Sequence, residues 1–363
     1  MLLRTTNPAR LMQAAGSFGA VLFLLYVLFF FNNGHLPNRV RSSMGTPPPP
    51  TLANSTLDFG AILYISMPFR TDRQDALSLM AAASGLKLTM IEGVDGDTIS
   101  HKAEPDGLPE AMRGSRLGCW RAHANAWRYV IDNNLGSALI LEDDVDWDMN
   151  IREVMGLWNW QLKYNNTIRW GQDVKKGWGE ECPYGCDWDE LFMGQCANKP
   201  NMERLDMHQT YFDPNGPKLE DNLDTFKKEI TQVWNMTQMD QMRITSPTYK
   251  PLCLQGYSLS HRGAMRMLYH NGGYLGLAAP IDLEIAWRTA EGKVSGYTLT
   301  PPAISAWRVG GGKDSDNDPV TNAEEIKSTG NSAGKSFGLQ KSVRKNLDAL
   351  LGKNYWEDMK KKN

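Results

Sequence analysis

The sequence predicts an α/β domain with a largely parallel sheet and a single transmembrane helix near the N-terminus. Short apolar runs of strand length alternate with amphipathic helical segments, an acidic cluster directly follows one of these runs, and a long uncharged stretch precedes them. Such alternation is typical of a sheet covered by helices on both faces. With 363 residues, of which 41% are hydrophobic and 22% charged, the chain can form a stable core and is neither a disordered nor a collagen-like protein.

The uncharged stretch is predicted to anchor the chain in a membrane. Residues 11–31 carry no charged side chain and end in the continuous apolar and aromatic run Val21–Phe31. A helix of this length, rising about 1.5 Å per residue, spans a hydrocarbon core of about 30 Å. The main alternative is a cleaved signal peptide, which has a shorter apolar part followed by a small-residue cleavage site, whereas Asn32 and Asn33 follow here. We therefore expect a signal anchor at residues 11–31 behind a cytosolic tail at residues 1–10.

Glycosylation motifs and cysteines favour a luminal location for the rest of the chain. Asn-x-Ser/Thr motifs stand at Asn54, Asn165 and Asn235. The five cysteines suit an oxidising compartment, where we expect one or two disulfides and at least one unpaired cysteine. Residues 32–57 contain the proline run Pro47–Pro50, which is typical of an extended stem. The sequence thus predicts a single-pass type II membrane protein of the Golgi or endoplasmic reticulum.

The globular part is expected to begin at residue 58 with a strand–helix–strand unit. Ala61–Ser66 and Leu86–Ile91 are apolar runs of strand length. Between them Arg73–Ser84 has its apolar residues at helical spacing, with Asp72 as the predicted N-cap and Gly85 at the end. The crossover of such a unit is nearly always right-handed.

A helix and a buried strand form the next unit. Apolar residues at intervals of four, three and four predict a helix that Gly136 ends, and Ala138–Leu141 follows as a strand buried on both faces. The residues of the helical face are Trp120, Ala124, Trp127 and Ile131. Residues 164–250 are predicted to form long loops with one or two helices. The elements expected further along are a strand at 252–260, helices at 262–270 and 282–291, a strand at 296–300, a Gly, Asp and Ser-rich loop at 308–335 and an amphipathic helix at 336–351.

The acidic cluster Glu142–Asp146 is the strongest candidate for a functional site. It directly follows the strand Ala138–Leu141, and in open α/β sheets ligands bind at the carboxyl ends of the strands. On an extended backbone Glu142 and Asp144 point to one side and Asp143 to the other. Two of these carboxylates could share one Mn²⁺ or Mg²⁺ ion, which can take diphosphate oxygens as further ligands. The alternative is a solvated acidic turn.

Two adjoining segments resemble the central signature of glycosyltransferase family 25, which includes bacterial lipooligosaccharide and collagen hydroxylysine galactosyltransferases. They are Gly118–Trp127 (GCWRAHANAW) and Leu135–Trp147 (LGSALILEDDVDW). Further matches in the same order extend the resemblance over residues 60–305; they are Tyr64–Ser66 with Arg70, Asp72 and Arg73, then Gly93–Gly96, Tyr257–Ser260 with Gly263 and Ala264, and Pro280–Asp282. Trp188–Cys196 and Lys313–Asp316 resemble a fungal-type branch of the family.

The resemblance implies a GT-A-like fold over residues 58–320, that is, a Rossmann-type domain that binds a nucleotide sugar, with a C-terminal helix and tail at 321–363. It also implies a UDP-sugar donor, usually UDP-galactose, and inversion at the anomeric carbon. At the matching positions Asp144 is the expected metal ligand and Asp143 the contact to the ribose or diphosphate. Asp146 is assigned to the metal site behind Asp144, with an exposed side chain as the alternative.

Three more residues are expected to contact the donor. Arg70 and Arg73 would bind the diphosphate or the base, since the guanidinium fork suits phosphate oxygens. The alternative for Arg73 is an ion pair with Asp72 or Asp75. Asp95 would bind the uridine or be an ordinary turn residue before Gly.

An inverting transfer also needs a base that takes the proton of the attacking hydroxyl. Asp282, after Pro280 and at the start of a predicted helix, is the candidate, and an ordinary helix cap is the alternative. Glu284 is the next candidate base. His123 is expected either to be a hydrogen-bonded core residue or to contact the acceptor.

These observations lead to one main expectation and two alternatives. The main one is a metal-dependent inverting glycosyltransferase that uses Mn²⁺ or Mg²⁺ and moves a hexose, galactose in the first place, from a UDP-sugar to a glycan or glycoprotein in the secretory lumen. A net charge of −2 gives no basic field for nucleic acid, which is not an expected partner. The alternatives are another metal-dependent enzyme acting on a diphosphate and a non-catalytic luminal protein that retains the fold.

Overall fold

The computed structural model describes residues 48–166, 168, 182–237, 240–310, 314–317 and 331–352. The predicted cytosolic tail, the predicted anchor and most of the predicted stem lie outside these residues. Within these ranges, no helix combines the length and the apolar character needed to cross a membrane. A compact unit begins at Pro50. Ala53 and Leu57, which the sequence placed in the stem, are buried in it, so these residues belong to the packed body.

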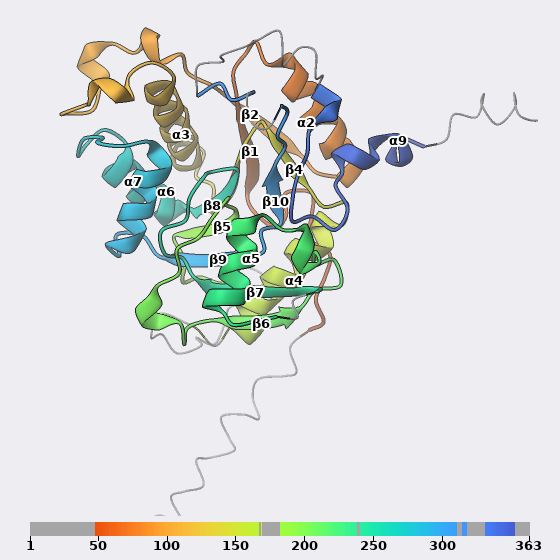
Figure 1. Ribbon diagram of the computed structural model, residues 1–363. Coiled ribbons are helices and arrows are strands. Elements are labelled where there is room, and N and C mark those ends of the chain that lie inside the picture. Colours follow the sequence, from red (N-terminus) through yellow and green to blue (C-terminus); the bar gives the residue numbers. More distant parts are fainter. Residues whose placement is uncertain are drawn as a thin grey trace, which may run out of the picture. The chain divides into compact units, whose positions relative to one another are not determined.

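The body is organised around a mixed sheet (Figure 1). In the part of the chain that the structure describes, eight strands are joined in the order β2-β1-β3-β8-β5-β9-β7-β6, and β4 pairs with β10 in a separate two-stranded sheet. Their bounds are β1 Ala61–Ser66, β2 Leu88–Glu92, β3 Ser137–Glu142, β4 Val145–Trp147, β5 Glu190–Gly194, β6 Gln209–Phe212, β7 Met242–Pro247, β8 Gly256–Ser260, β9 Gly296–Thr300 and β10 Ile304–Ala306.

The sequence predicts a largely parallel sheet, and the strand directions show that the sheet is mixed. Strand β1 runs parallel to β2 and to β3, and β5 runs parallel to β9. Strand β8 is antiparallel to both of its neighbours, β3 and β5, and β7 is antiparallel to both β9 and β6. In the eight-stranded sheet, all the strands except β8 and β7 therefore point the same way.

Helices cover the two faces of this sheet. The predicted strand–helix–strand unit is confirmed as β1, α2 and β2, with the two strands parallel. The helices are α2 Thr71–Ser84, α3 Ser115–Asp132, α4 Ile151–Trp160, α5 Asp224–Lys228, α6 His261–Asn271, α7 Ile281–Ala290 and α9 Leu347–Leu350. Short 3₁₀ turns lie at Gly96–Thr98, His101–Ala103, Glu110–Met112, Met202–Arg204, Leu219–Asp221, Asn331–Ala333 and Arg344–Asn346, and π turns at Gln161–Asn165 and Glu229–Val233.

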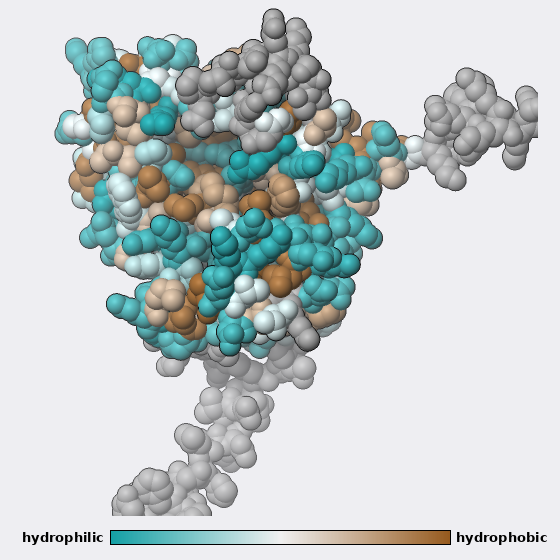
Figure 2. Space-filling model, in the orientation of Figure 1, coloured by the Kyte–Doolittle hydropathy of each residue, from teal (hydrophilic) through white to brown (hydrophobic). Residues whose placement is uncertain are grey.

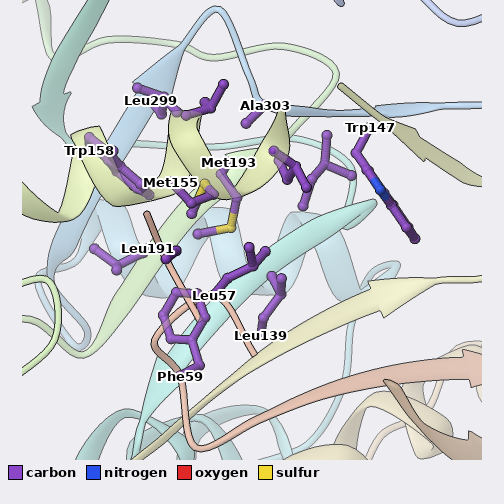
Figure 3. Close-up of a cluster of buried hydrophobic side chains, with 14 of the residues drawn as sticks. Leu57, Phe59, Leu139, Trp147, Met155, Trp158, Leu191, Met193, Leu299 and Ala303 are labelled. Atoms are coloured by element: carbon purple, nitrogen blue, oxygen red, sulfur yellow. The ribbon is translucent and has the colours of Figure 1, made fainter. Parts of the chain in front are cut away.

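The core is divided between the two faces because successive strand residues point to opposite sides. In β3, Leu139 and Leu141 join the cluster under α2 and α4, whereas Ala138 and Ile140 join the cluster under α3, α6 and α7. Figure 1 shows α3, α6 and α7 gathered on one side of the sheet. Figure 3 shows the first cluster, with Met155 of α4 beside strand residues such as Met193. Figure 2 shows mostly hydrophilic residues on the visible surface, with apolar residues in separate patches.

Two expectations about secondary structure were wrong. The segment 164–250 was predicted to be loops with helices, but it contains the strands β5, β6 and β7. The predicted helix at 336–351 is reduced to α9 with one 3₁₀ turn before it. Residues 341–343 instead lie along β4, where Val343 N donates to Trp147 O and Ser342 pairs with Asp148. We call residues 336–344 the C-terminal segment.

The cysteine prediction is confirmed. Cys182 pairs with Cys186, Cys196 pairs with Cys253, and Cys119 is unpaired. The second disulfide joins the end of β5 to the segment before β8.

Candidate active site

The acidic segment lies at the carboxyl ends of β1 and β3, as the sequence predicts. Strand β3 ends at Glu142, and Asp143 and Asp144 form the turn that leads into β4. Asp143 is buried and turns toward β1, where Ser66 Oγ donates a hydrogen bond to Asp143 Oδ2 at 2.7 Å. Arg73 Nη1 lies 2.5 Å from the other oxygen. Burial raises the pKa of Asp143, and Arg73 opposes that rise.

The two arginines of the Arg-x-Asp-Arg turn face several carboxylates. Arg70 pairs with Asp72 at 2.9 Å, Asp314 at 3.1 Å and Asp316 at 2.8 Å. Arg73 pairs with Asp314 at 3.1 Å as well as with Asp143. The hydrogen bond from Arg70 lowers the pKa of Asp72. Asp72 is not the N-cap of α2, as predicted, because the helix begins at Thr71 and Arg70 occupies the N-cap position. The turn therefore holds two cations at the carboxyl end of β1.

A hollow opens beside Arg73 and Asp144. Its wall combines acidic and basic side chains with one aromatic ring, and the residues that line it are Asp72, Arg73, Asp144, Trp307, Val309, Asp314 and Arg344. Burial and the negative charge of Glu142 raise the pKa of Asp144 to about 7, although Arg73 and Arg344 act in the opposite direction. Asp144 is thus an acidic group whose charge is poorly compensated by the protein alone.

These residues fit a divalent cation in part. In the described portion of the chain, no three His, Cys, Asp or Glu side chains converge as a complete metal site. However, Mg²⁺ commonly binds through one or two carboxylates and takes its remaining ligands from substrate phosphates and water. Asp144, with Glu142 close enough to raise its pKa, provides such a partial set of oxygen ligands. A divalent cation there would offset the excess negative charge.

Asp146 does not line this hollow, and its carboxylate is already hydrogen-bonded. Its Oδ2 accepts from Ser336 Oγ at 2.7 Å and from Ser342 Oγ at 2.5 Å. Its Oδ1 accepts from the backbone N–H groups of Trp147 and Arg344. The side chain is fully buried. We therefore assign Asp146 to anchoring the C-terminal segment rather than to the metal site that the sequence suggested.

Asp95 lies at the carboxyl end of β2, away from the hollow. Its side chain is exposed and caps a 3₁₀ turn by accepting from Asp97 N at 3.0 Å. The turn packs against α3 through glycines: a Cβ at Gly118 would lie 2.1 Å from Val94 O. The turn interpretation is therefore observed, and the edge position still leaves Asp95 accessible to a ligand.

Asp282 lies at the start of α7. Its Oδ2 accepts from Cys253 N at 3.4 Å and its Oδ1 from Leu283 N at 2.9 Å. Glu284, the reserve base, is buried, accepts from Ala278 N and Ala279 N, and pairs with Arg288. Because of these hydrogen bonds and this ion pair, Glu284 is a structural residue. Asp282 is the more accessible carboxylate of the two.

A second hollow lies beside the first. Trp307 and Val309 line the first hollow, whereas Ala306 and Arg308 line the second, so the extended segment after β10 separates them. Polar and aromatic side chains share the second wall, among them Gln195, Gln255, Ser305 and Phe337. Cys196 also lines it, and its disulfide partner Cys253 contacts Asp282.

His123 is a core residue rather than an open contact. It is 1% exposed, and its Nδ1 lies 3.0 Å from the hydroxyl of Tyr257, which also accepts from Trp127 Nε1. Burial alone would lower the pKa of His123, but Tyr257, Cys119 and Glu142 raise it well above the usual value. Its Nε2 lies 3.9 Å from Glu142 Oε1, so a protonated imidazole would support the acidic segment from inside the protein.

Sequence reasoning missed Trp307 and Arg344. Both follow residue 300, and neither belongs to a sequence motif that is typical of a catalytic or binding site. Arg344 fell within a predicted amphipathic helix, where a surface charge is ordinary. The hydrogen bonds of Asp146 that place it span 190 or more positions, and no local pattern contains that pairing.

Comparisons with known proteins agree with the resemblance. The family model described as "Glycosyltransferase family 25 (LPS biosynthesis protein)" matches residues 60–282, more than half of the chain. A mouse (Mus musculus) protein named procollagen galactosyltransferase 2 is 26% identical over 129 residues, which cover 30% of this chain and 21% of the relative. Its human (Homo sapiens) counterpart is 27% identical over 110 residues, which cover 27% and 17%. The chain thus spans about a fifth of the length of these relatives.

Proposed function

The chain belongs to glycosyltransferase family 25, and from this membership we propose that it transfers a hexose, galactose in the first place, from a UDP-sugar to a hydroxyl group of a glycan or glycoprotein. The observation that carries the proposal is the hollow at the carboxyl end of β3, where Asp144 faces Arg73 and Arg344. Two relatives are named galactosyltransferases, which supports galactose as the sugar.

In this proposal the donor binds at the carboxyl ends of β1, β2 and β3, as expected for a GT-A-like domain. The diphosphate enters the hollow and exchanges the carboxylates around Arg70 and Arg73 for phosphate oxygens, which the guanidinium fork binds equally well. Asp143 keeps Arg73 in place through their ion pair. Asp95, at the end of β2, is placed to contact the uridine.

Asp144, with Glu142, would hold a Mn²⁺ or Mg²⁺ ion. When bound, such an ion neutralises charge on the diphosphate and makes UDP a better leaving group. The sugar transfer itself balances without any further reagent. The acceptor oxygen forms a bond to the anomeric carbon, the bond from that carbon to the diphosphate oxygen breaks, and UDP departs with the electron pair.

Asp282 is our candidate for the base that takes the acceptor proton. It lies next to the Cys196–Cys253 disulfide, and Cys196 lines the second hollow. We propose that the acceptor approaches through this second hollow, where Gln195, Gln255 and Phe337 offer the amide and aromatic groups that suit sugar hydroxyls and ring faces. One hollow would then receive the donor and the adjacent one the acceptor.

We also propose a luminal location. The two disulfides fit an oxidising compartment. The three Asn residues of the glycosylation motifs, Asn54, Asn165 and Asn235, are all exposed. The predicted anchor at residues 11–31 would then make the chain a type II membrane protein of the Golgi or endoplasmic reticulum.

The direct test is UDP release by the full-length protein from a series of UDP-sugars, with and without Mn²⁺. We expect turnover of UDP-galactose that needs the metal and stops in excess chelator. Full turnover in excess chelator would contradict the metal site at Asp144. No turnover with any UDP-sugar and any glycan acceptor would contradict the proposed activity.

A further inference from the structure

We infer that Arg344, from the C-terminal segment beyond the matched family region, binds the phosphate groups of the donor opposite Asp144. This inference rests on the proposed function, because it assigns the ligand of the same hollow. Arg344 lies outside residues 60–282 and lines the hollow together with Arg73 and Asp144.

The contacts of Arg344 show a cation without a carboxylate partner in the described parts of the chain. Its Nε lies 3.2 Å from the sulfur of Met80, and one terminal nitrogen lies 3.5 Å from the backbone oxygen of Asp143. The guanidinium group lies over the ring of Trp307, 5.3 Å from the ring centre. A guanidinium group has five N–H donors, so most of those of Arg344 have no protein partner among the described residues.

Unlike Arg344, the other two arginines of the site form ion pairs with carboxylates. Arg70 and Arg73 already pair with acidic side chains, so a phosphate must displace a carboxylate to reach them. Arg344 can accept a phosphate without breaking any ion pair. Burial lowers the pKa of Arg344, which means that its charge is poorly solvated and that an entering anion would stabilise it.

The position of Arg344 is fixed by backbone contacts rather than by its own side chain. Asp146 accepts from Arg344 N and from both serines of the C-terminal segment. Val343 is fully buried, and its N–H donates to Trp147 O in β4. Because β4 follows the turn of Asp143 and Asp144, the acidic segment and Arg344 are held in one rigid piece. Asp146 is therefore a positioning residue for Arg344.

The test compares three variants of the full-length protein: Arg344→Gln, Arg344→Lys and the matched control Lys345→Gln. Lys345 is the exposed next residue, so its replacement removes the same charge from the same segment. Binding of UDP and of inorganic pyrophosphate, each with Mn²⁺, is measured by calorimetry. Thermal unfolding without ligand shows whether each variant keeps its fold.

We expect Arg344→Gln to weaken both ligands at least tenfold, Arg344→Lys to restore part of the affinity, and Lys345→Gln to bind as the wild type does. We expect the melting temperature of Arg344→Gln to change little, because the side chain makes few hydrogen bonds. Wild-type affinity in Arg344→Gln would overturn the inference. A large fall in melting temperature with no rescue by lysine would also overturn it, since the role would then be structural.

The same measurements separate this inference from the proposed function. If the wild type binds pyrophosphate through Arg344 but transfers sugar from no UDP-sugar, the transferase proposal fails and the phosphate site stands. If the wild type turns over UDP-galactose and Arg344→Gln does so with the same affinity for UDP, the transferase proposal stands and the Arg344 assignment fails. If the wild type binds neither UDP nor pyrophosphate, both fail.

Discussion

Ser342 Oγ donates a hydrogen bond of 2.5 Å to Asp146 Oδ2, although 196 positions separate the two residues in the chain. Through this contact the C-terminal segment is attached directly behind the acidic turn that follows β3. The buried carboxylate of Asp146 thus links the part of the chain that carries Asp144 to the part that carries Arg344. The site is therefore assembled from segments that lie far apart in the chain.

The first prediction concerns this anchor. Asp146→Asn should lower the free energy of unfolding by about 2–3 kcal/mol, because charge-assisted hydrogen bonds to a buried group are lost. The loss should be present without any metal, which is measured by denaturant unfolding in excess chelator. If Asp146→Asn has wild-type stability but binds Mn²⁺ more weakly, Asp146 is a metal ligand, as the sequence suggested, and not an anchor.

The second prediction concerns Asp144. Asp144→Asn should weaken the binding of Mn²⁺ with UDP at least tenfold, as measured by calorimetry, since an oxygen ligand loses its charge. Stability without metal should be equal or higher, because the repulsion between Asp144 and Glu142 is removed. Normal binding of Mn²⁺ and UDP by this variant would show that the acidic cluster is a solvated turn and not a metal site.

The third prediction separates catalysis from donor binding. Asp282→Asn should leave the binding of Mn²⁺ and UDP near that of the wild type, because this residue lies outside the first hollow. Its kcat should fall by roughly 10²–10⁴, the usual effect of removing a positioned base. Single-turnover transfer measures this rate. Glu284→Gln is not a suitable control, because it also removes the ion pair between Glu284 and Arg288. Transfer by Asp282→Asn at the wild-type rate would show that Asp282 is only a helix residue.

The fourth prediction concerns Glu190, which is fully buried in β5. One of its oxygens accepts from Thr289 Oγ1, and the other has no hydrogen-bond partner among the described residues. Burial raises its pKa from 4.5 to about 8. Between these values the native state holds a proton that the unfolded state has released, so stability should fall as pH rises, by up to about 1.4 kcal/mol per pH unit.

Glu190→Gln tests this directly, since the amide stays neutral. The variant should match the wild type near pH 4 and be more stable near pH 8, as measured by denaturant unfolding. An unchanged pH dependence would show that Glu190 is not the responsible group.

The fifth prediction concerns topology. In intact microsomes, added protease should spare the body of the protein, and glycosidase treatment should increase its electrophoretic mobility, because the exposed asparagines lie in the lumen. Asn54→Gln, Asn165→Gln and Asn235→Gln, made singly, should each remove at most one glycan. A protease-sensitive body without glycans would contradict the luminal location.

The sequence predicted the elements whose pattern is local. Trp120, Ala124 and Trp127 have helical spacing, which predicted α3, and the continuous apolar run of β3 predicted that strand and the acidic turn after it. A helix buried on one face shows apolar residues at a helical period, and a strand buried on both faces shows a continuous apolar run. Trp120, Ala124 and Trp127 are fully buried, and Ile131, the fourth residue of that helical face, is partly buried.

Other elements were hidden because long-range partners determine them. Strand β7 contains Arg243, whose charge argues against a buried strand, yet Arg243 is 1% exposed and pairs with Asp213 at 2.5 Å. The C-terminal segment has apolar residues at helical spacing, but Ser336 and Ser342 bind Asp146, and the segment lies along β4 instead. Neither pairing is visible in a local window.

The order of the strands has a consequence for synthesis of the protein. Strand β9 lies between β5 and β7 in the sheet, although it follows both in the chain. Chains emerge N-terminus first, so the two halves of the sheet cannot join until β9 has been made, and Arg344 arrives later still. A chain that stops soon after β10 would complete the sheet but lack the C-terminal segment. Such a truncated protein would leave the buried Asp146 carboxylate without its two serine partners and the first hollow without Arg344, so it would be less stable than the intact protein and would bind its donor more weakly.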